Sequence, residues 1–228
     1  MNGMTTEAKK DNQVKSKHRV TEHGEVFTSE REVNAMLDLV KSETERIDSR
    51  FLEPACGTGN FLAEILNRKL AVVESRYKKS QLEWERYAVL AVSSIYGVDI
   101  LQDNIGECIE RLFLIFDTLY TQRFKGNCKE DFRKSVRFIL NRNILWGDAL
   151  SLTTPGDKPT PIIFSEWSAV NGSMLKPRDF MLSTLLDKNQ QVEKVNDEDN
   201  LTHLNEPIKE FPLIHFLNLA DDTDKLQS

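Results

Sequence analysis

FLEPACGTGNFL, residues 51–62, predicts a short apolar strand, a turn with two glycines and the start of a helix. Glu53 stands where the strand ends. Gly57 and Gly59 allow a sharp turn and leave no side chain between the backbone and a bound molecule. The helix that begins near Asn60 directs free backbone N–H groups to the same place. The stretch therefore predicts a ligand site, although similar glycine turns also occur in α/β proteins that bind nothing there.

Two later segments repeat the pattern of an apolar strand that ends in an acidic residue. IYGVDI, residues 95–100, ends near Asp99, and NILWGDAL, residues 143–150, contains Asp148. Carboxyl ends of strands face the ligand crevice of an open α/β sheet, where a carboxylate accepts hydroxyl or amine hydrogens. The alternative for each aspartate is the N-cap of the helix that follows.

These segments, taken in order, resemble one protein family. EPACGTGNF at 53–61 resembles the S-adenosylmethionine (SAM) motif of bacterial DNA adenine-N6 methyltransferases of restriction–modification type. HGEVFT at 23–28 resembles their upstream cofactor-contacting segment, and the two strand–acid segments resemble the next strands. The resemblance implies an α/β fold with a Rossmann-like methyltransferase sheet and helices on both faces, incomplete or truncated relative to full-length members. It also implies methyl transfer from SAM to adenine N6 in DNA.

The resemblance assigns a role to each acidic residue. Asp99 would hold the SAM ribose, Asp148 the adenine amino group and Glu53 the methionine ammonium. Phe27 and Phe61 could pack on the ligand or in the core. The residues expected to bind the cofactor are Phe27, Thr28, Glu53, Pro54, Ala55, Gly57, Gly59, Asp99, Ile100, Asp148 and Ala149.

The catalytic Asn-Pro-Pro-Tyr motif of this family is absent, because no two of the seven prolines are adjacent. A strand is expected at 162–164, and Ser165-Glu166-Trp167 follows it. Ser165 and Trp167 are therefore the candidate catalytic residues, with Trp167 stacking on a flipped base. The alternative for Trp167 is a partly buried surface aromatic. The alternative function is a non-catalytic SAM-binding subunit or remnant, which needs a partner chain with the catalytic motif and the target-recognition domain.

Length and charge suggest one α/β domain with tails. The chain has 228 residues and a net charge of −6, all of it contributed by residues 186–228. We expect a mobile tail at 1–19, a SAM-binding domain at 20–185 and an acidic, largely irregular tail at 186–228. An apolar segment at 207–217 could dock on the body of the same chain or on a partner, and we expect the body.

Composition also limits which partners and which cellular compartment are expected. No apolar run is long enough to span a membrane, and the four histidines lack metal-ligand spacing. The three cysteines suggest a reducing cytoplasm rather than disulfides. DNA is the expected partner, with target recognition supplied by a partner subunit. Lys176 and Arg178 form a modest basic candidate for the DNA contact.

The expected elements follow from apolar spacing and capping residues. Ser29 and Glu32 form the signature of a capping box at the start of the first helix. Residues 136–140 could end a helix or form a strand. Helices are expected at 29–46, 59–68, 71–94 (a packing helix or a partner surface) and from 102–104 to 120, strands at 50–53, 95–99 and 144–146, and loop with a short helix at 121–134.

Overall fold

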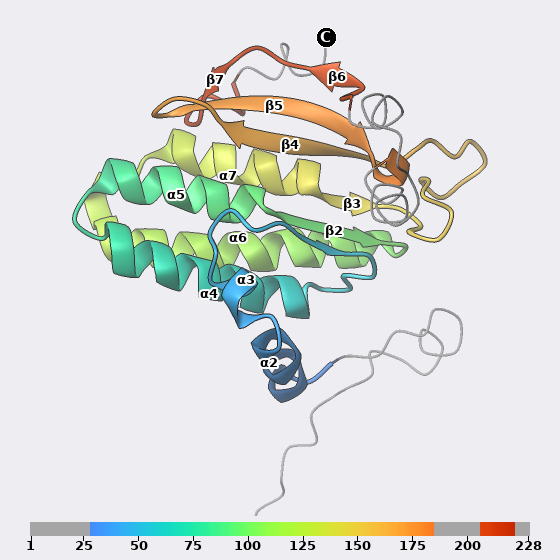
Figure 1. The fold of residues 1–228 in the computed structure, drawn as a ribbon, viewed down its shortest axis with the longest axis horizontal. Coiled ribbons are helices and arrows are strands. Elements are labelled where there is room, and N and C mark those ends of the chain that lie inside the picture. The colour runs from blue at the N-terminus through green and yellow to red at the C-terminus, as the bar shows by residue number, and fades with distance from the viewer. Residues whose placement is uncertain (1–27, 185–205, 222–228) are drawn as a thin grey trace, which may run out of the picture.

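The structure, a computed structural model, describes residues 28–184 and 206–221 of a mixed α/β fold (Figure 1). Its helices are α2 (Glu30–Asp38), α3 (Lys41–Thr44), α4 (Asn60–Tyr77), α5 (Gln81–Ser93), α6 (Gln102–Phe124), the 3-10 turn η1 (Lys125–Asn127) and α7 (Glu130–Asn143). Its strands are β1 (Phe51–Glu53), β2 (Ile95–Asp99), β3 (Ile144–Trp146), β4 (Ile163–Ala169), β5 (Met174–Met181), β6 (Lys209–Glu210) and β7 (Ile214–His215).

The first sheet contains the three strands that the sequence predicts. β1, β2 and β3 are parallel and lie in that order, with β2 in the centre. Glu53 pairs with Gly97, and Asp99 pairs with Trp146. All three strands therefore end at the same edge of the sheet, and each acidic candidate comes at or after such an end.

The second sheet is antiparallel and forms a separate layer. β4 pairs with β5, and β6 and β7 both pair with β5. Figure 1 shows α5 and α7 between this sheet and the pair α4 and α6. The predicted strand at 162–164 thus begins a hairpin outside the parallel sheet.

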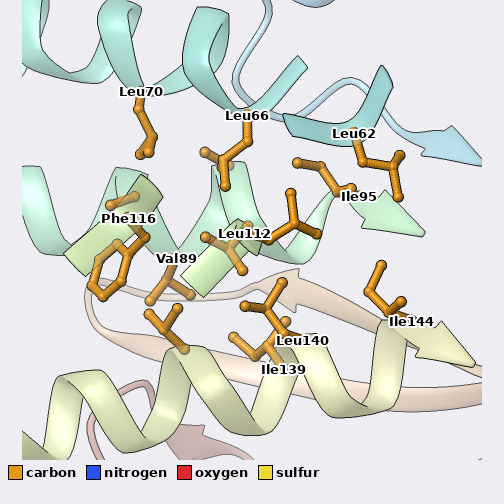
Figure 2. Packing of buried hydrophobic residues seen from close by; sticks show 14 of the residues in the cluster. Leu62, Leu66, Leu70, Val89, Ile95, Leu112, Phe116, Ile139, Leu140 and Ile144 are labelled. Carbon is orange, nitrogen blue, oxygen red and sulfur yellow. The ribbon is translucent and has the colours of Figure 1, made fainter. Parts of the chain in front are cut away.

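Apolar side chains from four helices form the main core. Leu62, Leu66 and Leu70 of α4 point toward Leu112 and Phe116 of α6 (Figure 2). Residues of α5, α7, β2 and β3 belong to the same cluster; in Figure 2 these are Val89, Ile139, Leu140, Ile95 and Ile144. The parallel sheet is therefore fixed on the face that α4 and α6 cover.

The opposite face of the parallel sheet, for which a covering helix is predicted, packs against a smaller cluster. Among the described residues, Tyr96 and Val98 of this face pack with Ile162, Phe164 and Leu182. The ring of Tyr96 meets Phe164 edge to face, with centroids 5.3 Å apart. In the described part of the chain, this face is covered by the open end of the antiparallel hairpin and by Leu182, where a helical segment begins after β5.

Helix boundaries differ from the prediction where burial outweighs local signals. The predicted capping box of Ser29 and Glu32 is confirmed, but α2 ends at Asp38 rather than continuing to 46. The predicted break near 69–70 is wrong because Lys69 and Leu70 are buried inside α4. Ser80 caps α5 instead, through a hydrogen bond from the backbone of Glu83.

Three further predictions concern α7, the capping of α6 by residues 102–104, and the packing of α5. Residues 136–140 lie inside α7, which begins at Glu130, so the predicted loop over 121–134 is shorter than expected. α6 has no side-chain cap from Asp103 or Asn104, because its N-cap is Leu101. α5 buries Trp84 completely, which confirms the packing interpretation of the 71–94 segment.

The apolar segment near the C-terminus docks on the body, as predicted. Phe211, Ile214, Phe216 and Leu219 are buried and belong to the main core. Residues 206–221 therefore belong to the domain, which corrects the expectation of a tail from 186 onward for this segment. The predicted tail at 1–19 lies outside the described residues.

Candidate functional site

The glycine turn joins β1 to α4 and is tied to β2. Gly57 and Gly59 have φ of 51° and 84°, in the left-handed region that favours glycine. The Cys56 N–H donates to the Val98 carbonyl at 2.9 Å, and the Gly59 N–H donates to the Cys56 carbonyl at 2.8 Å. The turn is thus held by backbone hydrogen bonds on both sides, and its shape requires both glycines.

Cys56 fills space under this turn. Its side chain is buried, and contact with the Cys108 thiol together with burial raises its pKa far above the usual range. A thiol that stays protonated is a poor nucleophile. The structure therefore favours a small space-filling role for Cys56 over that of a reactive thiol.

We expect Gly59→Ala to lower the free energy of unfolding by about 1–3 kcal/mol more than Gly57→Ala. Both replacements carry the strain of a left-handed alanine. Only the methyl group at 59 would lie 2.6 Å from Cys108 Sγ, whereas nothing lies within 4 Å of the corresponding position at Gly57. Urea unfolding of both variants measures the difference, which Cys108→Ala should remove. Equal losses would mean that Cys108 does not constrain the turn.

Asp99 connects the turn to the end of β2. Its carboxylate accepts the Gly57 N–H at 2.8 Å, the Leu101 N–H at 2.9 Å and the Asn104 side-chain amide at 3.2 Å. The side chain is buried, with 8% of the residue exposed. Asp99 does not cap α6 as the alternative proposed. It brings the glycine turn and the end of β2 to one point.

Glu53 lies at the end of β1, on the same edge of the sheet. Its side chain is half-buried, and burial raises its pKa, although a hydrogen bond from the Ala55 N–H at 3.4 Å opposes the shift. A half-buried carboxylate at this position would gain from a cationic partner. Pro54 and Ala55, which follow, are exposed.

Asp148 follows β3 and holds its own loop. Its carboxylate accepts the Leu150 N–H at 2.9 Å, and this bond together with the Ser151 hydroxyl lowers its pKa. Two strand spacings, about 10 Å, separate β1 from β3. A ligand that reached both Glu53 and Asp148 would therefore extend across the end of β2.

Apolar residues directly follow two of these acids, Ile100 after Asp99 and Ala149 after Asp148. Ile100 is 46% exposed, and Ala149 packs against the cluster that contains Val98. The sequence-based site omits Trp146, whose ring is 38% exposed and whose indole N–H donates to the Ile100 carbonyl at 2.9 Å. The signal available in the sequence was a tryptophan at the end of a predicted strand, two residues before Asp148.

The upstream segment reaches the site through Thr28. The Thr28 carbonyl accepts the side-chain amide of Asn60, the first residue of α4, at 3.1 Å. Phe27 lies outside the described residues. Phe61 packs against the main core, in agreement with the packing alternative.

A buried lysine positions the strand that carries Glu53. Lys69 of α4 is fully buried, and its Nζ donates to the Ile47 carbonyl at 3.1 Å and to Ser94 Oγ at 2.6 Å. It also donates to the Ser49 carbonyl. Because Ile47 and Ser49 directly precede β1, Lys69 fixes the loop that delivers this strand to the sheet.

The stability contribution of Lys69 should depend on pH. Burial lowers its pKa from 10.5 to about 7. Between these values the unfolded chain binds a proton that the folded chain does not, so stability rises with pH across this window. We expect the unfolding free energy of the wild type, relative to Lys69→Met, to rise from about pH 7 toward 10.5. Urea unfolding at several pH values measures it; a constant difference would contradict the lowered pKa.

The candidate catalytic residues lie elsewhere, on β4. Ser165 is 2% exposed; its hydroxyl donates to Asp179 at 2.7 Å and accepts from Arg142 at 2.7 Å. Trp167 is 5% exposed, and its indole N–H donates to Asn143 at 3.0 Å. Both side chains are enclosed and engaged, so this arrangement gives neither the open face nor the free oxygen that a flipped base requires. The structure therefore favours a packing role for both residues, which lie apart from the ends of β1, β2 and β3.

The modest basic candidate is neutralised by nearby acids. Lys176 pairs with Glu210 at 2.7 Å, and Arg178 pairs with Glu166 at 2.7 Å. Arg50 also pairs with Glu166, at 3.0 Å. These pairs leave little unbalanced positive charge on this surface for DNA phosphates.

Comparison with protein-family models gave no match, and comparisons with curated proteins and with solved structures gave none either. Within residues 28–184 and 206–221, no helix is both long and apolar enough to cross a bilayer. The same residues contain no group of three or more His, Cys, Asp or Glu side chains that could hold a metal ion.

Proposed function

We propose that this chain binds SAM at the carboxyl ends of β1, β2 and β3. In this proposal it is the cofactor-binding part of a DNA adenine-N6 methyltransferase of restriction–modification type, acting in the cytoplasm. The observation that carries the proposal is the 2.8 Å hydrogen bond from the Gly57 N–H to the Asp99 carboxylate. It joins the glycine turn after β1 to the acid at the end of β2, which are two of the segments that resemble the family.

The chemistry of SAM suits the groups at this edge. Glu53 would accept from the methionine ammonium, and its raised pKa would fall when that cation binds. Asp148 would accept from the adenine amine, and Ile100 would pack on the adenine ring. The ligand would then span the two strand spacings from β1 to β3.

Asp99 would have to rearrange to hold the ribose. A carboxylate has about four acceptor positions, and three donors already occupy three of those of Asp99. One ribose hydroxyl can use the fourth position. The second hydroxyl would replace either the Gly57 N–H or the Asn104 amide, so we expect a local change in the turn on binding.

A second candidate function is a SAM-binding subunit without catalytic activity of its own. The burial of Trp167 favours it, because no described residue of this chain then replaces the missing Asn-Pro-Pro-Tyr motif. In the family, the methyl group passes directly from the sulfonium to the adenine amine, and the protein positions the two reactants. A partner chain would supply the amine acceptor, the stacking ring and target recognition to DNA.

Two measurements on the purified chain test these proposals. Isothermal titration with SAM should show one site, and S-adenosylhomocysteine should compete for it. ATP serves as the control, because it carries the adenosine without the methionine. An absence of binding up to about 1 mM SAM would refute the cofactor proposal.

The second measurement follows labelled methyl groups from SAM to DNA of mixed sequence. Transfer by this chain alone would establish an independent enzyme and contradict the subunit proposal. Binding of SAM without transfer would support the subunit, and addition of a partner that carries the missing motif should then restore transfer.

A further inference from the structure

All three tryptophans lie in the described part of the chain, and they differ in burial. Trp84 is fully buried and Trp167 is 5% exposed, whereas Trp146 is 38% exposed. The indole N–H of Trp146 nevertheless donates to the Ile100 carbonyl at 2.9 Å. The ring of Trp146 is therefore held at its edge, while part of its surface faces solvent. Tryptophan combines a large apolar face with one polar group, and this combination is enriched where proteins make contacts.

β3 places Trp146 beside Asp99 at the carboxyl edge of the parallel sheet (Figure 1). The two residues are partners in the register of β2 and β3, so their side chains leave the sheet on the same face. Burial agrees with this direction, because Ile144, two residues before Trp146, packs in the main core. The Gly147 N–H then donates to the Asp99 carbonyl at 3.0 Å. The indole thus lies against the end of β2, at the carbonyl of the residue that directly follows Asp99.

Two neighbouring residues limit what the indole of Trp146 can contact. Ile100, which accepts the indole N–H, is itself 46% exposed and adds an aliphatic side chain at this edge. Asp148, two residues after Trp146, adds a carboxylate. Hydrogen bonds from the Leu150 N–H and the Ser151 hydroxyl lower the pKa of Asp148, so it is ionised at neutral pH. Open apolar surface and an anionic acceptor together suit a flat ring that carries an amino group, as adenine does.

We propose that Trp146 is the stacking residue for the adenine ring of the nucleoside bound at this edge. The exposed face of the indole lies on the purine, while Asp148 accepts from the amino group on the rim of the purine. This inference rests on the proposed SAM site and deepens it, since it names the residue that recognises the ring itself rather than its amine or the ribose. It also makes Trp146 an internal fluorescent reporter of whether the site is occupied.

Acrylamide quenching of tryptophan fluorescence in the full chain tests the stacking contact directly. Because Trp84 and Trp167 are buried, the quenching reports mainly on Trp146. Saturating SAM should protect the ring, so that quenching falls toward the level of Trp146→Phe, which keeps only the two buried tryptophans. Methionine at the same concentration lacks the purine and should leave the quenching unchanged.

Titration calorimetry with SAM separates stacking from a merely structural role. Trp146→Ala should weaken SAM binding by about tenfold or more, whereas Trp146→Phe keeps an aromatic face and should retain most of the affinity. Leu213→Ala is the matched control, since Leu213 is 48% exposed and lies between β6 and β7, away from the carboxyl edge of the parallel sheet. Circular dichroism melts check that each variant remains folded.

The two measurements distinguish failure of the stacking role from failure of the SAM site. If SAM binds the wild type but leaves Trp146 open to acrylamide, or binds Trp146→Ala as tightly as the wild type, the stacking role is overturned and the SAM site stands. An absence of both binding and protection would refute the cofactor proposal and the stacking role together. Should Trp146→Ala fail to fold, the quenching of the wild type alone decides.

Discussion

Trp167→Ala is expected to lower the free energy of unfolding by about 3–5 kcal/mol. The indole is 5% exposed and meets Phe138 edge to face, with centroids 6.1 Å apart. Its N–H donates to the side chain of Asn143, which in turn donates to the backbone carbonyls of Ser93 and Ile95. Trp167 therefore connects β4 with the end of α7 and the start of β2.

The measurement is urea unfolding followed by circular dichroism, with Trp167→Phe as the matched variant. Phenylalanine keeps most of the apolar volume but leaves the Asn143 oxygen unpaired, at a cost of about 1–3 kcal/mol. A base-stacking tryptophan would give another pattern, in which alanine abolishes methyl transfer and leaves stability unchanged. That pattern would return Trp167 to the catalytic site.

The prediction for Trp167 also shows why part of the fold could not be read from the sequence. A strand followed by a polar residue and an aromatic has the same local pattern whether it joins the parallel sheet or starts a hairpin. The difference arises from the partner strand β5, whose pairing with β4 aligns Ser165 with Asp179. That pairing is a tertiary contact, and no local propensity reports it.

The sequence predicted structure correctly where the physical cause lies within a few neighbouring residues. The capping box at Ser29 forms because its two hydrogen bonds lie within one turn of chain. The glycine turn forms because its backbone requires positive φ at Gly57 and Gly59. In contrast, α4 continues through Lys69 because the side-chain nitrogen of this residue donates to three acceptors. Two are the carbonyls of Ile47 and Ser49 in the loop before β1, and the third is Ser94 Oγ. No residue near Lys69 in the sequence predicts that these distant acceptors lie beside it.

In the candidate site, too, local features could be predicted from the sequence and tertiary contacts could not. The parallel register brings Glu53, Gly57 and Asp99 to one edge, as the strand–acid pattern predicts. The sequence did not reveal that the Asp99 carboxylate is already engaged by three donors of its own chain. Such engagement depends on how the turn and the start of α6 are placed relative to β2, which is settled only by packing.

Asp99→Ala is expected to reduce SAM affinity by about 10–100-fold, the loss of one charge-assisted hydrogen bond at about 1.5–3 kcal/mol. The same change leaves the Gly57 N–H, the Leu101 N–H and the Asn104 amide without their common acceptor. Each unpaired buried donor costs about 1–3 kcal/mol, so the free energy of unfolding should fall as well. Titration calorimetry and urea unfolding measure the two losses separately.

Asp99→Asn separates the ligand contact from the support of the turn. Asparagine keeps the size and one acceptor oxygen, so it should retain more of the stability than alanine while still weakening the ribose contact. Asp157→Ala, in the exposed loop after β3, is the surface control and should change neither quantity. Unchanged SAM affinity in both Asp99→Ala and Asp148→Ala would contradict the cofactor site. A loss of stability alone would then show that Asp99 serves only to hold the glycine turn against the end of β2.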